Sequence, residues 1–304
     1  MKYDILIVGG GAAGMAAAIK AGERGASVLL AEREAELGGI LNQCIHNGFG
    51  LRYFGEDLTG RDYADRFRRK IPDRKIEVMT DSEVVSIGED RSAVIAGKDG
   101  VIKVYFDYCI MAAGCRERTI GSIIVGGTRP AGVYTAGEAQ KMINLGHYDL
   151  GERFVILGSG NVGQIMARRL KVLGKDVAAI VEKNGTPGGL PANRRDCIEA
   201  YDIPLILRST VDMIYGEDRV SAVRVKNLDT GNTDIIACDA LITALGLIPD
   251  REIVRSLNEN GKYPDWLHFC GNCESVHDIV DGVTRQGERV ASDICNLMEE
   301  RQNA

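Results

Sequence analysis

Residues 3–14 read YDILIVGGGAAG and residues 153–163 read RFVILGSGNVG, so one pattern occurs twice in this 304-residue chain. Each copy begins with a short apolar run, typical of a buried parallel strand, and then turns through a G-x-G-x-x-G motif. A helix and a second apolar run follow, and that run ends at Glu32 in the first copy and at Glu182 in the second. The order of strand, glycines, helix, strand and acid predicts two Rossmann-like units.

Each glycine has its own task in such a turn. The first permits the tight bend, the second lets backbone amides reach a pyrophosphate, and the third lets the helix pack closely on the sheet. Gly14 precedes Glu32 by 18 residues and Gly163 precedes Glu182 by 19, close to the spacing expected for an acid that holds ribose hydroxyls. A single motif of this kind is weak evidence, but two complete copies predict that two dinucleotides bind.

The composition is that of a globular protein with a substantial core. The chain is 45% hydrophobic and carries a net charge of −6, with no cluster of Lys or Arg, so nucleic-acid binding is not expected. No apolar stretch is long enough to suggest a membrane span. The eight cysteines are scattered, and no secretion signal is recognised at the N-terminus. We therefore expect reduced thiols, no metal site and a cytoplasmic protein.

The predicted fold class is α/β, with two Rossmann-like dinucleotide-binding domains, one inserted into the other. Short β-like runs between the two copies predict a small antiparallel meander, at residues 76–79, 84–87, 92–96 and 101–106. Runs at residues 220–225 and 233–237 predict a second meander after the second copy. The outer domain is expected at residues 1–118 and 247–304 and the inserted domain at 119–246. Apolar residues from Val283 to Met298 at helical spacing predict a final helix with one buried face.

Three further stretches carry a family resemblance: residues 112–114 (AAG), 158–160 (GSG) and 269–272 (FCGN). Here the chain resembles the two-dinucleotide-binding-domain flavoproteins of the pyridine nucleotide-disulfide oxidoreductase superfamily, with thioredoxin-reductase-like topology. The resemblance covers essentially the whole chain. It implies FAD in the outer domain, NAD(H) in the inserted domain, and an FAD-dependent NAD(P)H oxidoreductase that transfers electrons.

The motifs and the resemblance together give the expected cofactor-binding residues. The FAD residues are Gly9, Gly11, Ala12, Ala13, Gly14, Glu32, Gly39, Leu41, Asn47, Val84, Ala113, Gly114, Gly271, Asn272, Val280 and Asp281. The NAD residues are Gly158, Gly160, Asn161, Val162, Gly163, Glu182, Ala244 and Gly246. By resemblance, the backbone amides near Val280 and Asp281 face the O2 edge of the flavin. The family usually has Asp where this chain has Asn272, whose side chain can still hydrogen-bond a hydroxyl.

Two longer stretches narrow the resemblance. Residues 38–50 (GGILNQCIHNGFG) resemble bacterial NAD(FAD)-dependent dehydrogenases that are subunits of larger dehydrogenases. Residues 129–137 (RPAGVYTAG) are similar to a stretch of opine oxidases, hydrogen cyanide synthase and the sarcosine oxidase α subunit. The resemblance extends to the NADH-linked subunit that accompanies glycerol-3-phosphate-dehydrogenase-like flavoproteins. It implies a partner dehydrogenase subunit that exchanges electrons with this chain, and it leaves a homo- or a hetero-oligomer open.

The cysteine pattern argues against the disulfide relay of the superfamily. Only Cys44 follows the glycine pair at residues 38–39, and the inserted domain has no C-x-x-C. Cys270 and Cys273 do form a C-x-x-C, so a thiol-disulfide reductase remains an alternative to two packed thiols. A non-catalytic flavin-binding subunit of a dehydrogenase complex is another alternative. No catalytic side chain is assigned, and Cys44, Cys270 and Cys273 are the weak candidates.

The acid of the second copy predicts which nicotinamide dinucleotide binds. A carboxylate at Glu182 accepts hydrogen bonds from a free ribose diol and repels a 2′-phosphate, so NADH is expected over NADPH. Arg194 and Arg195 lie a dozen residues further on and leave open the alternative that a phosphate is bound.

Overall fold

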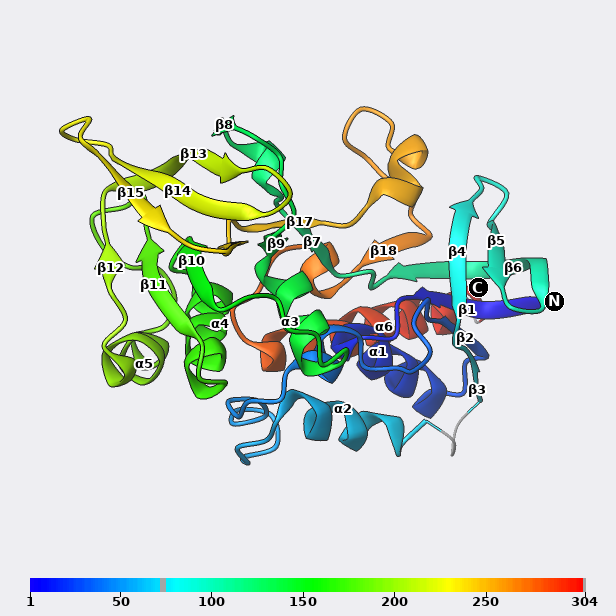
Figure 1. Cartoon of the computed structure of the whole chain (residues 1–304). Helices are drawn as coiled ribbons and strands as arrows, with labels where there is room; N and C mark the ends of the chain where they lie inside the picture. Colours follow the sequence, from blue (N-terminus) through cyan, green and yellow to red (C-terminus); the bar gives the residue numbers. More distant parts are fainter. Residues whose placement is uncertain (72–74, 303–304) are drawn as a thin grey trace. The chain divides into compact units, whose positions relative to one another are not determined.

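The computed structural model describes residues 1–71 and 75–302 of the chain (Figure 1). The chain divides into two compact units: Met1–Arg116 and Pro249–Ala304 form unit 1, and Glu117–Ile248 forms unit 2. Strands β7 (Cys115–Glu117) and β17 (Leu247–Pro249) lie where the chain passes from one unit to the other. Residues 303–304 of the expected outer domain lie outside the described residues.

Unit 1 is built on a sheet with the strand order β3-β2-β1-β6-β5-β4, and β18 also pairs with β6. Strands β3, β2, β1, β6 and β18 pair in parallel, whereas β4 and β5 continue from β6 as an antiparallel meander. The bounds are β1 (Lys2–Val8), β2 (Val28–Ala31), β3 (Ile76–Met79), β4 (Ser82–Ile87), β5 (Ser92–Gly97), β6 (Gly100–Met111) and β18 (Leu267–Phe269). Ile5, Leu6 and Ile7 are fully buried, as a central parallel strand requires.

One expectation for the stretch between the two copies is wrong. Residues 76–79 do not join the meander but form β3, an edge strand in which Val78 pairs in parallel with Leu30. A four-residue apolar run does not encode the direction of its partner, because parallel and antiparallel pairing bury the same side chains. The meander itself is formed by β4, β5 and the first half of β6, while the second half of β6 pairs with β1.

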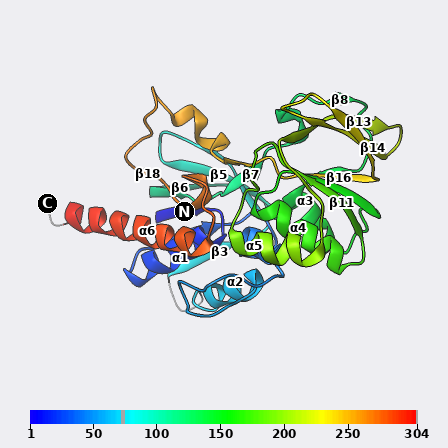
Figure 2. The ribbon, with the colours of Figure 1, turned by 90° about the vertical axis from the view of Figure 1, so that its left-hand side faces the viewer.

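The α-helices in the described part of unit 1 are α1 (Ala12–Glu23), α2 (Gly60–Arg68) and α6 (Val280–Gln302). Helices α1 and α6 lie side by side (Figures 1 and 2). Their backbones come so close that a Cβ at Gly287 would lie 2.2 Å from the carbonyl oxygen of Ala13. Ala291 and Ile294 of α6 are fully buried in this contact region, so the final helix has the expected buried face.

Unit 2 holds a parallel sheet of order β12-β11-β10-β16-β9 and a second sheet of order β15-β14-β13-β8. The strands are β8 (Gly126–Gly127), β9 (Val133–Thr135), β10 (Arg153–Leu157), β11 (Asp176–Val181), β12 (Leu205–Ile206), β13 (Ser209–Gly216), β14 (Val220–Asn227), β15 (Thr233–Ala237) and β16 (Ala240–Thr243). The helices are α3 (Ala136–Asn144), α4 (Asn161–Val172) and α5 (Pro191–Asn193). The expected second meander is present as β14 and β15, and β13 joins it in antiparallel pairing although the sequence analysis missed that strand.

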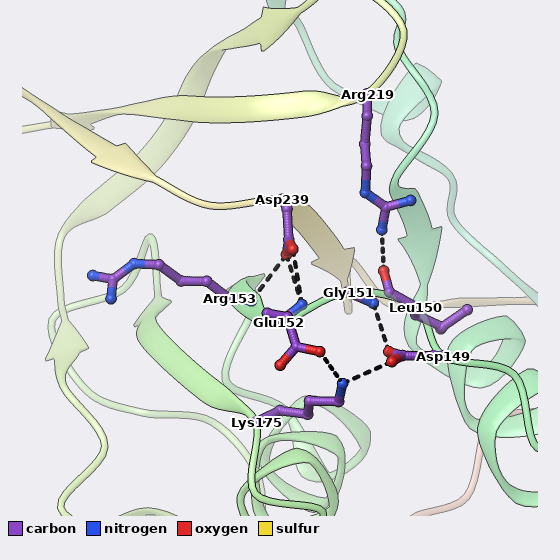
Figure 3. Close-up of polar contacts among 8 residues, drawn as sticks. All are labelled: Asp149, Leu150, Gly151, Glu152, Arg153, Lys175, Arg219 and Asp239. Carbon is purple, nitrogen blue, oxygen red and sulfur yellow. Dashed lines mark hydrogen bonds and ion pairs between the residues drawn. The ribbon is translucent and has the colours of Figure 1, made fainter.

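Polar contacts organise the amino-terminal edge of the parallel sheet in unit 2 (Figure 3). The carboxylate of Asp239 accepts hydrogen bonds from the backbone N–H of Glu152 at 2.8 Å and of Arg153 at 2.9 Å. The Lys175 ammonium contacts the carboxylates of Asp149 at 2.9 Å and Glu152 at 2.6 Å. These contacts hold the loop that leads into β10, at the end of the sheet away from the glycine-rich turn.

Candidate functional site

The glycine-rich turn of unit 1 connects β1 to α1, and a different structural constraint acts at each of its glycines. Gly9 has φ +103°, and Gly14 lies so close to the turn that a Cβ there would be 1.8 Å from the carbonyl oxygen of Gly9. Gly11 has an ordinary φ of −73°, and a Cβ there would meet no atom within 4 Å. Neither backbone strain nor protein packing therefore requires glycine at position 11. A glycine there leaves room for a ligand to approach the turn closely.

The turn of unit 2, between β10 and α4, repeats this arrangement. Gly158 has φ +107°, and a Cβ at Gly163 would lie 2.4 Å from the carbonyl oxygen of Gly158. Gly160 again has an ordinary φ, −64°, and open space where its Cβ would be. Each unit thus keeps a cradle in front of its turn that a single Cβ would partly fill.

The helices that follow the two turns begin without a side-chain cap. The N-cap residues Gly11 of α1 and Gly160 of α4 supply no side-chain acceptor. By contrast, the side chains of Thr59 and Thr135 cap α2 and α3. The first N–H groups of α1 and α4 therefore lack intrahelical partners and carry the positive end of the helix dipole, which suits a pyrophosphate.

Glu32 lies directly after β2, beside the first turn, and is 5% exposed. One carboxylate oxygen accepts a hydrogen bond from the backbone N–H of Gly10 at 2.7 Å, and the other accepts one from Glu34 at 2.8 Å. These bonds orient the carboxylate while leaving acceptor capacity on both oxygens. The geometry is suited to the two hydroxyls of a ribose.

Glu182 occupies the same place after β11. Its Oε2 accepts hydrogen bonds from the backbone N–H and the hydroxyl of Ser159, at 3.0 and 2.6 Å, and its Oε1 accepts one from the N–H of Asn184 at 3.0 Å. Burial alone would raise the pKa of the Glu182 carboxyl, but the hydrogen bonds from Ser159 and Asn184 outweigh it and hold the pKa below its ordinary value. The group is therefore a carboxylate at neutral pH.

The short helix η1 (Gly39–Gln43) begins against the first turn, since a Cβ at Gly39 would lie 3.3 Å from the Cα of Gly11. Leu41 is buried, and the side chain of Asn47 donates to the carbonyl of Asp57 at 3.3 Å. Val84 is buried in β4. Of the expected residues in this part, Gly39 is the one that these contacts bring to the cradle.

Other residues expected to bind FAD lie in the segment before α6 and in the turn after β6. Gly271 has φ +65°, and its N–H donates to the side chain of Gln286 at 2.8 Å. The side-chain oxygen of Asn272 accepts from the N–H of His277 at 2.9 Å, and its amide nitrogen donates to the thiol sulfur of Cys115 at 3.7 Å. Ala113 and Gly114 close the turn after β6, where Gly114 has φ +75°.

A cavity of unit 1 opens at the amino end of α6, where the flavin O2 edge is expected near Val280 and Asp281. Arg52, His277, Asp281 and Arg285 are among its lining residues. Asp281 is 3% exposed; its Oδ2 accepts from the N–H of Arg52 at 2.7 Å, and Oδ1 has no hydrogen-bond partner among the described residues. The Nδ1 of His277 is likewise without a partner there. Unpaired buried polar atoms of this kind fit a site that a polar ring system fills.

The remaining residues expected to bind NAD surround the turn of unit 2. A Cβ at Gly158 would lie 2.3 Å from the carbonyl oxygen of Ala244, so the end of β16 packs against the turn. Gly246 follows with φ +104°. Val162, in the first turn of α4, is 36% exposed and faces away from the core.

A segment that the sequence analysis missed lies across the turn of unit 2. Residues 188–190, which we call the strap, contact the glycine-rich turn: the N–H of Gly188 donates to Ser159 Oγ at 2.8 Å. The signal was present in the sequence, because a glycine pair follows the acid by six residues in both copies, at residues 38–39 and 188–189. The repeat therefore extends beyond the acid at which it was expected to end.

A family model described as pyridine nucleotide-disulphide oxidoreductase matches residues 3–263. The chain belongs to this family. Its fold is Rossmann-type α/β, and the two cradles, uncapped helices and oriented acids fit FAD and NAD(P)H, the dinucleotides that this family uses.

Three curated proteins are similar to this chain over different shares of their own length. Hydrogen cyanide synthase subunit HcnB of Pseudomonas protegens is 34% identical over 191 residues, which is 60% of this chain but 39% of that protein. Thioredoxin reductase of Treponema pallidum is 26% identical, covering 81% of this chain and 77% of the relative. Sarcosine oxidase subunit alpha of Rhizobium meliloti is 27% identical, covering 86% of this chain and 26% of that protein. The chain thus spans about two fifths of HcnB and about a quarter of the sarcosine oxidase subunit.

A solved structure shows the same fold. Thioredoxin reductase of T. acidophilum superimposes with a TM-score of 0.79 at 22% identity, covering 97% of this chain and 98% of that one. The predicted thioredoxin-reductase-like architecture is therefore confirmed.

The family name refers to a disulphide, but the cysteines of this chain are poorly placed for one that exchanges electrons. Cys270 and Cys273 are free and fully buried. Burial raises the pKa of Cys273 to about 11, raises that of Cys270 as well, and raises that of Cys44 to about 12. Cys44 donates to the carbonyl of Ile40 at 3.3 Å, and Cys273 to that of Asp250 at 3.0 Å. Protonated, buried thiols favour packing over redox exchange.

The described residues were expected to contain neither a metal site nor a membrane-spanning helix. Across residues 1–71 and 75–302, no group of three or more His, Cys, Asp or Glu side chains is arranged to hold a metal ion. In the same part of the chain, no helix combines the length and the apolar character that crossing a bilayer would need.

Proposed function

We propose that this family member is an NADH:FAD oxidoreductase that exchanges the electrons with a partner dehydrogenase subunit or acceptor. The observation that carries the proposal is the pair of dinucleotide cradles, at Gly11 and Gly160, in a chain whose Cys270 and Cys273 are fully buried. Bound FAD and nicotinamide supply the hydride chemistry themselves. What remains for the chain is to bind both dinucleotides, to orient them and to exclude water.

The geometry of each unit supports the following proposed residue roles. In unit 1, Gly11 leaves room for a pyrophosphate at the amino end of α1, and Glu32 accepts hydrogen bonds from a ribose. The amides at the start of α6, near Val280 and Asp281, meet the flavin O2 edge and favour negative charge there. In unit 2, Gly160 and Glu182 take the roles of Gly11 and Glu32 for the nicotinamide dinucleotide.

The preference for NADH over NADPH is supported by charges around Glu182. The carboxylate is ionised and held by three hydrogen bonds, so it repels a 2′-phosphate. The two arginines that leave phosphate binding open are each bonded to an acid: Arg194 to Glu199 at 2.9 Å and Arg195 to Asp196 at 2.8 Å. These pairs make a phosphate-binding role for them less favourable.

The partner subunit is supported by two of the relatives, HcnB and sarcosine oxidase subunit alpha, whose names describe subunits of larger enzymes. By analogy with these subunits, we propose a partner that exchanges electrons with this chain. We also propose a cytoplasmic location, because no disulfide joins cysteines among the described residues, as expected in a reducing compartment.

Anaerobic reduction of the purified, FAD-loaded chain tests the function. NADH is expected to bleach the flavin absorbance faster than NADPH, and an artificial acceptor such as dichlorophenolindophenol is expected to restore it. Flavin that stays oxidised with both nucleotides would instead establish a non-catalytic flavin-binding subunit. Faster bleaching by NADPH would overturn the nucleotide preference while leaving the oxidoreductase assignment intact.

A further inference from the structure

The two glycine-rich turns and the first residues of their helices differ at four aligned positions, and at three of them only unit 2 has a polar side chain. When the turns are aligned on their glycines, small or apolar residues of unit 1 correspond to polar residues of unit 2. The pairs are Gly10 and Ser159, Ala12 and Asn161, and Met15 and Gln164. Met15, Ser159 and Gln164 are all fully buried, so the change from apolar to polar at these positions needs a physical reason.

All three polar side chains of unit 2 contact the strap, residues 188–190. Gln164 Nε2 donates to the carbonyls of both Ser159 and Gly188 at 2.6 Å. Asn161 Oδ1 accepts from the N–H of Leu190 at 2.7 Å. Ser159 Oγ accepts from the N–H of Gly188 at 2.8 Å. Side chains of the turn and the first helical turn thus fix the strap at three points.

The equivalent segment of unit 1 is held differently. The N–H of Gly38 donates to the backbone carbonyl of Gly10 at 2.8 Å. This backbone hydrogen bond replaces the bond that the Ser159 side chain forms with Gly188 in unit 2. Met15 cannot form the bonds that Gln164 forms. The three polar residues therefore belong to the nicotinamide site of unit 2 and are not a general requirement of the fold.

Ser159 connects the strap to the acid. Its hydroxyl accepts from Gly188 and donates to Glu182 Oε2, while its backbone N–H donates to the same oxygen. The N–H of Asn184 donates to Oε1. With both oxygens engaged by the protein, the carboxylate cannot rotate to make room for a bulky anion without breaking hydrogen bonds in a buried site.

We propose that Ser159, Asn161 and Gln164 are positioning residues for the nicotinamide dinucleotide. They hold the strap across the turn of unit 2, and Ser159 in addition holds Glu182 in the orientation that accepts a ribose diol and rejects a 2′-phosphate. The nucleotide selectivity is thus set by a three-residue support as well as by the acid itself. This inference rests on the proposed preference for NADH.

Limited proteolysis of the FAD-loaded chain tests the strap without any turnover. Trypsin cleaves after Arg194 and Arg195, which lie just beyond the strap and have exposed side chains. Gln164→Met introduces the residue that unit 1 carries, and it is expected to accelerate cleavage there about tenfold, because lost hydrogen bonds increase the population of the open segment. Gln140→Met, at another buried glutamine of unit 2, is the matched control. Equal cleavage rates in Gln164→Met and wild type would overturn the role of Gln164.

Nucleotide kinetics test the link to Glu182. In Ser159→Ala, the KM for NADH is expected to rise about tenfold with kcat unchanged, while kcat/KM for NADPH does not fall. Ser209→Ala removes a buried hydroxyl that bonds the carbonyl of Leu207, and it keeps the backbone N–H that donates to the main-chain carbonyl of Glu182, so it should behave like wild type. A parallel loss with both nucleotides would overturn the positioning role. A wild-type preference for NADPH would overturn the proposed function, whereas the proteolysis would still report on the strap.

Discussion

The backbone N–H of Gly10 donates a hydrogen bond to the carboxylate of Glu32 at 2.7 Å, which ties the acid after β2 to the turn after β1. Replacing Glu32 by Ala removes this bond and the acceptor for a ribose at the same time. We expect the variant to lose FAD on dilution, with a dissociation constant at least about tenfold higher. The ratio of flavin to protein absorbance after gel filtration measures this loss.

A matched control is available on the same sheet. Glu83 lies in β4 and is exposed. Glu83→Ala changes the net charge equally but does not touch the turn, so it should retain FAD like wild type. Equal flavin contents in Glu32→Ala and Glu83→Ala would contradict the assignment of Glu32 to the FAD ribose.

Alanine at the second glycine of each turn should separate the two sites. Gly11 and Gly160 have ordinary φ values and open space at the Cβ position, so alanine there costs no folding energy. Gly11→Ala should therefore fold but bind FAD at least about tenfold more weakly, and Gly160→Ala should keep FAD but bind NADH more weakly by a similar factor. Circular dichroism melting, flavin content and NADH titration measure the three effects.

The third glycine provides the contrast. A Cβ at Gly14 would lie 1.8 Å from the carbonyl oxygen of Gly9, so Gly14→Ala must displace α1 from the sheet. This variant should lose stability and FAD together. If Gly11→Ala loses stability as strongly as Gly14→Ala does, the cradle at Gly11 is a packing feature and not a ligand site.

Much of the fold could be predicted from the sequence because its determinants are local. The tight turn at Gly9, the close packing at Gly14 and the acid at Glu32 all follow from residue type and short spacing. The pairing of β3 could not be predicted, because parallel partners are chosen by long-range packing and not by the four residues of the strand.

The contact between the strap and the turn of unit 2 could not be predicted from residue spacing. Gln164 and Gly188 are 24 residues apart, and Ser159 and Gly188 are 29 apart. A hydrogen bond between them depends on how α4 and the segment after β11 are placed in space. The glycine pair after each acid was visible in both copies, but its contact with the turn became evident only with the fold.

Asp239 should contribute to stability and not to cofactor binding, since it lies at the amino-terminal edge of the sheet in unit 2 (Figure 3). Asp239→Ala leaves the N–H groups of Glu152 and Arg153 to be solvated by water in place of their acceptor, at a cost of about 1–2 kcal/mol. Thermal melting should shift down by several degrees, with FAD content unchanged. Asp239→Asn keeps one acceptor oxygen and should lose less. A loss of FAD without a change in melting would contradict this structural role.

The buried cysteines should not take part in turnover. Because burial raises the pKa of Cys273 to about 11, its thiolate fraction is small at pH 8 and grows as the pH approaches that pKa. We expect iodoacetamide to modify Cys273 of the native protein very slowly at pH 8 and faster toward pH 10, as mass spectrometry of the peptides would show. The double variant Cys270→Ser, Cys273→Ser should reduce an artificial acceptor with NADH at close to the wild-type rate. Two additional titratable thiols after anaerobic NADH reduction, together with an inactive double variant, would instead establish the thiol-disulfide mechanism.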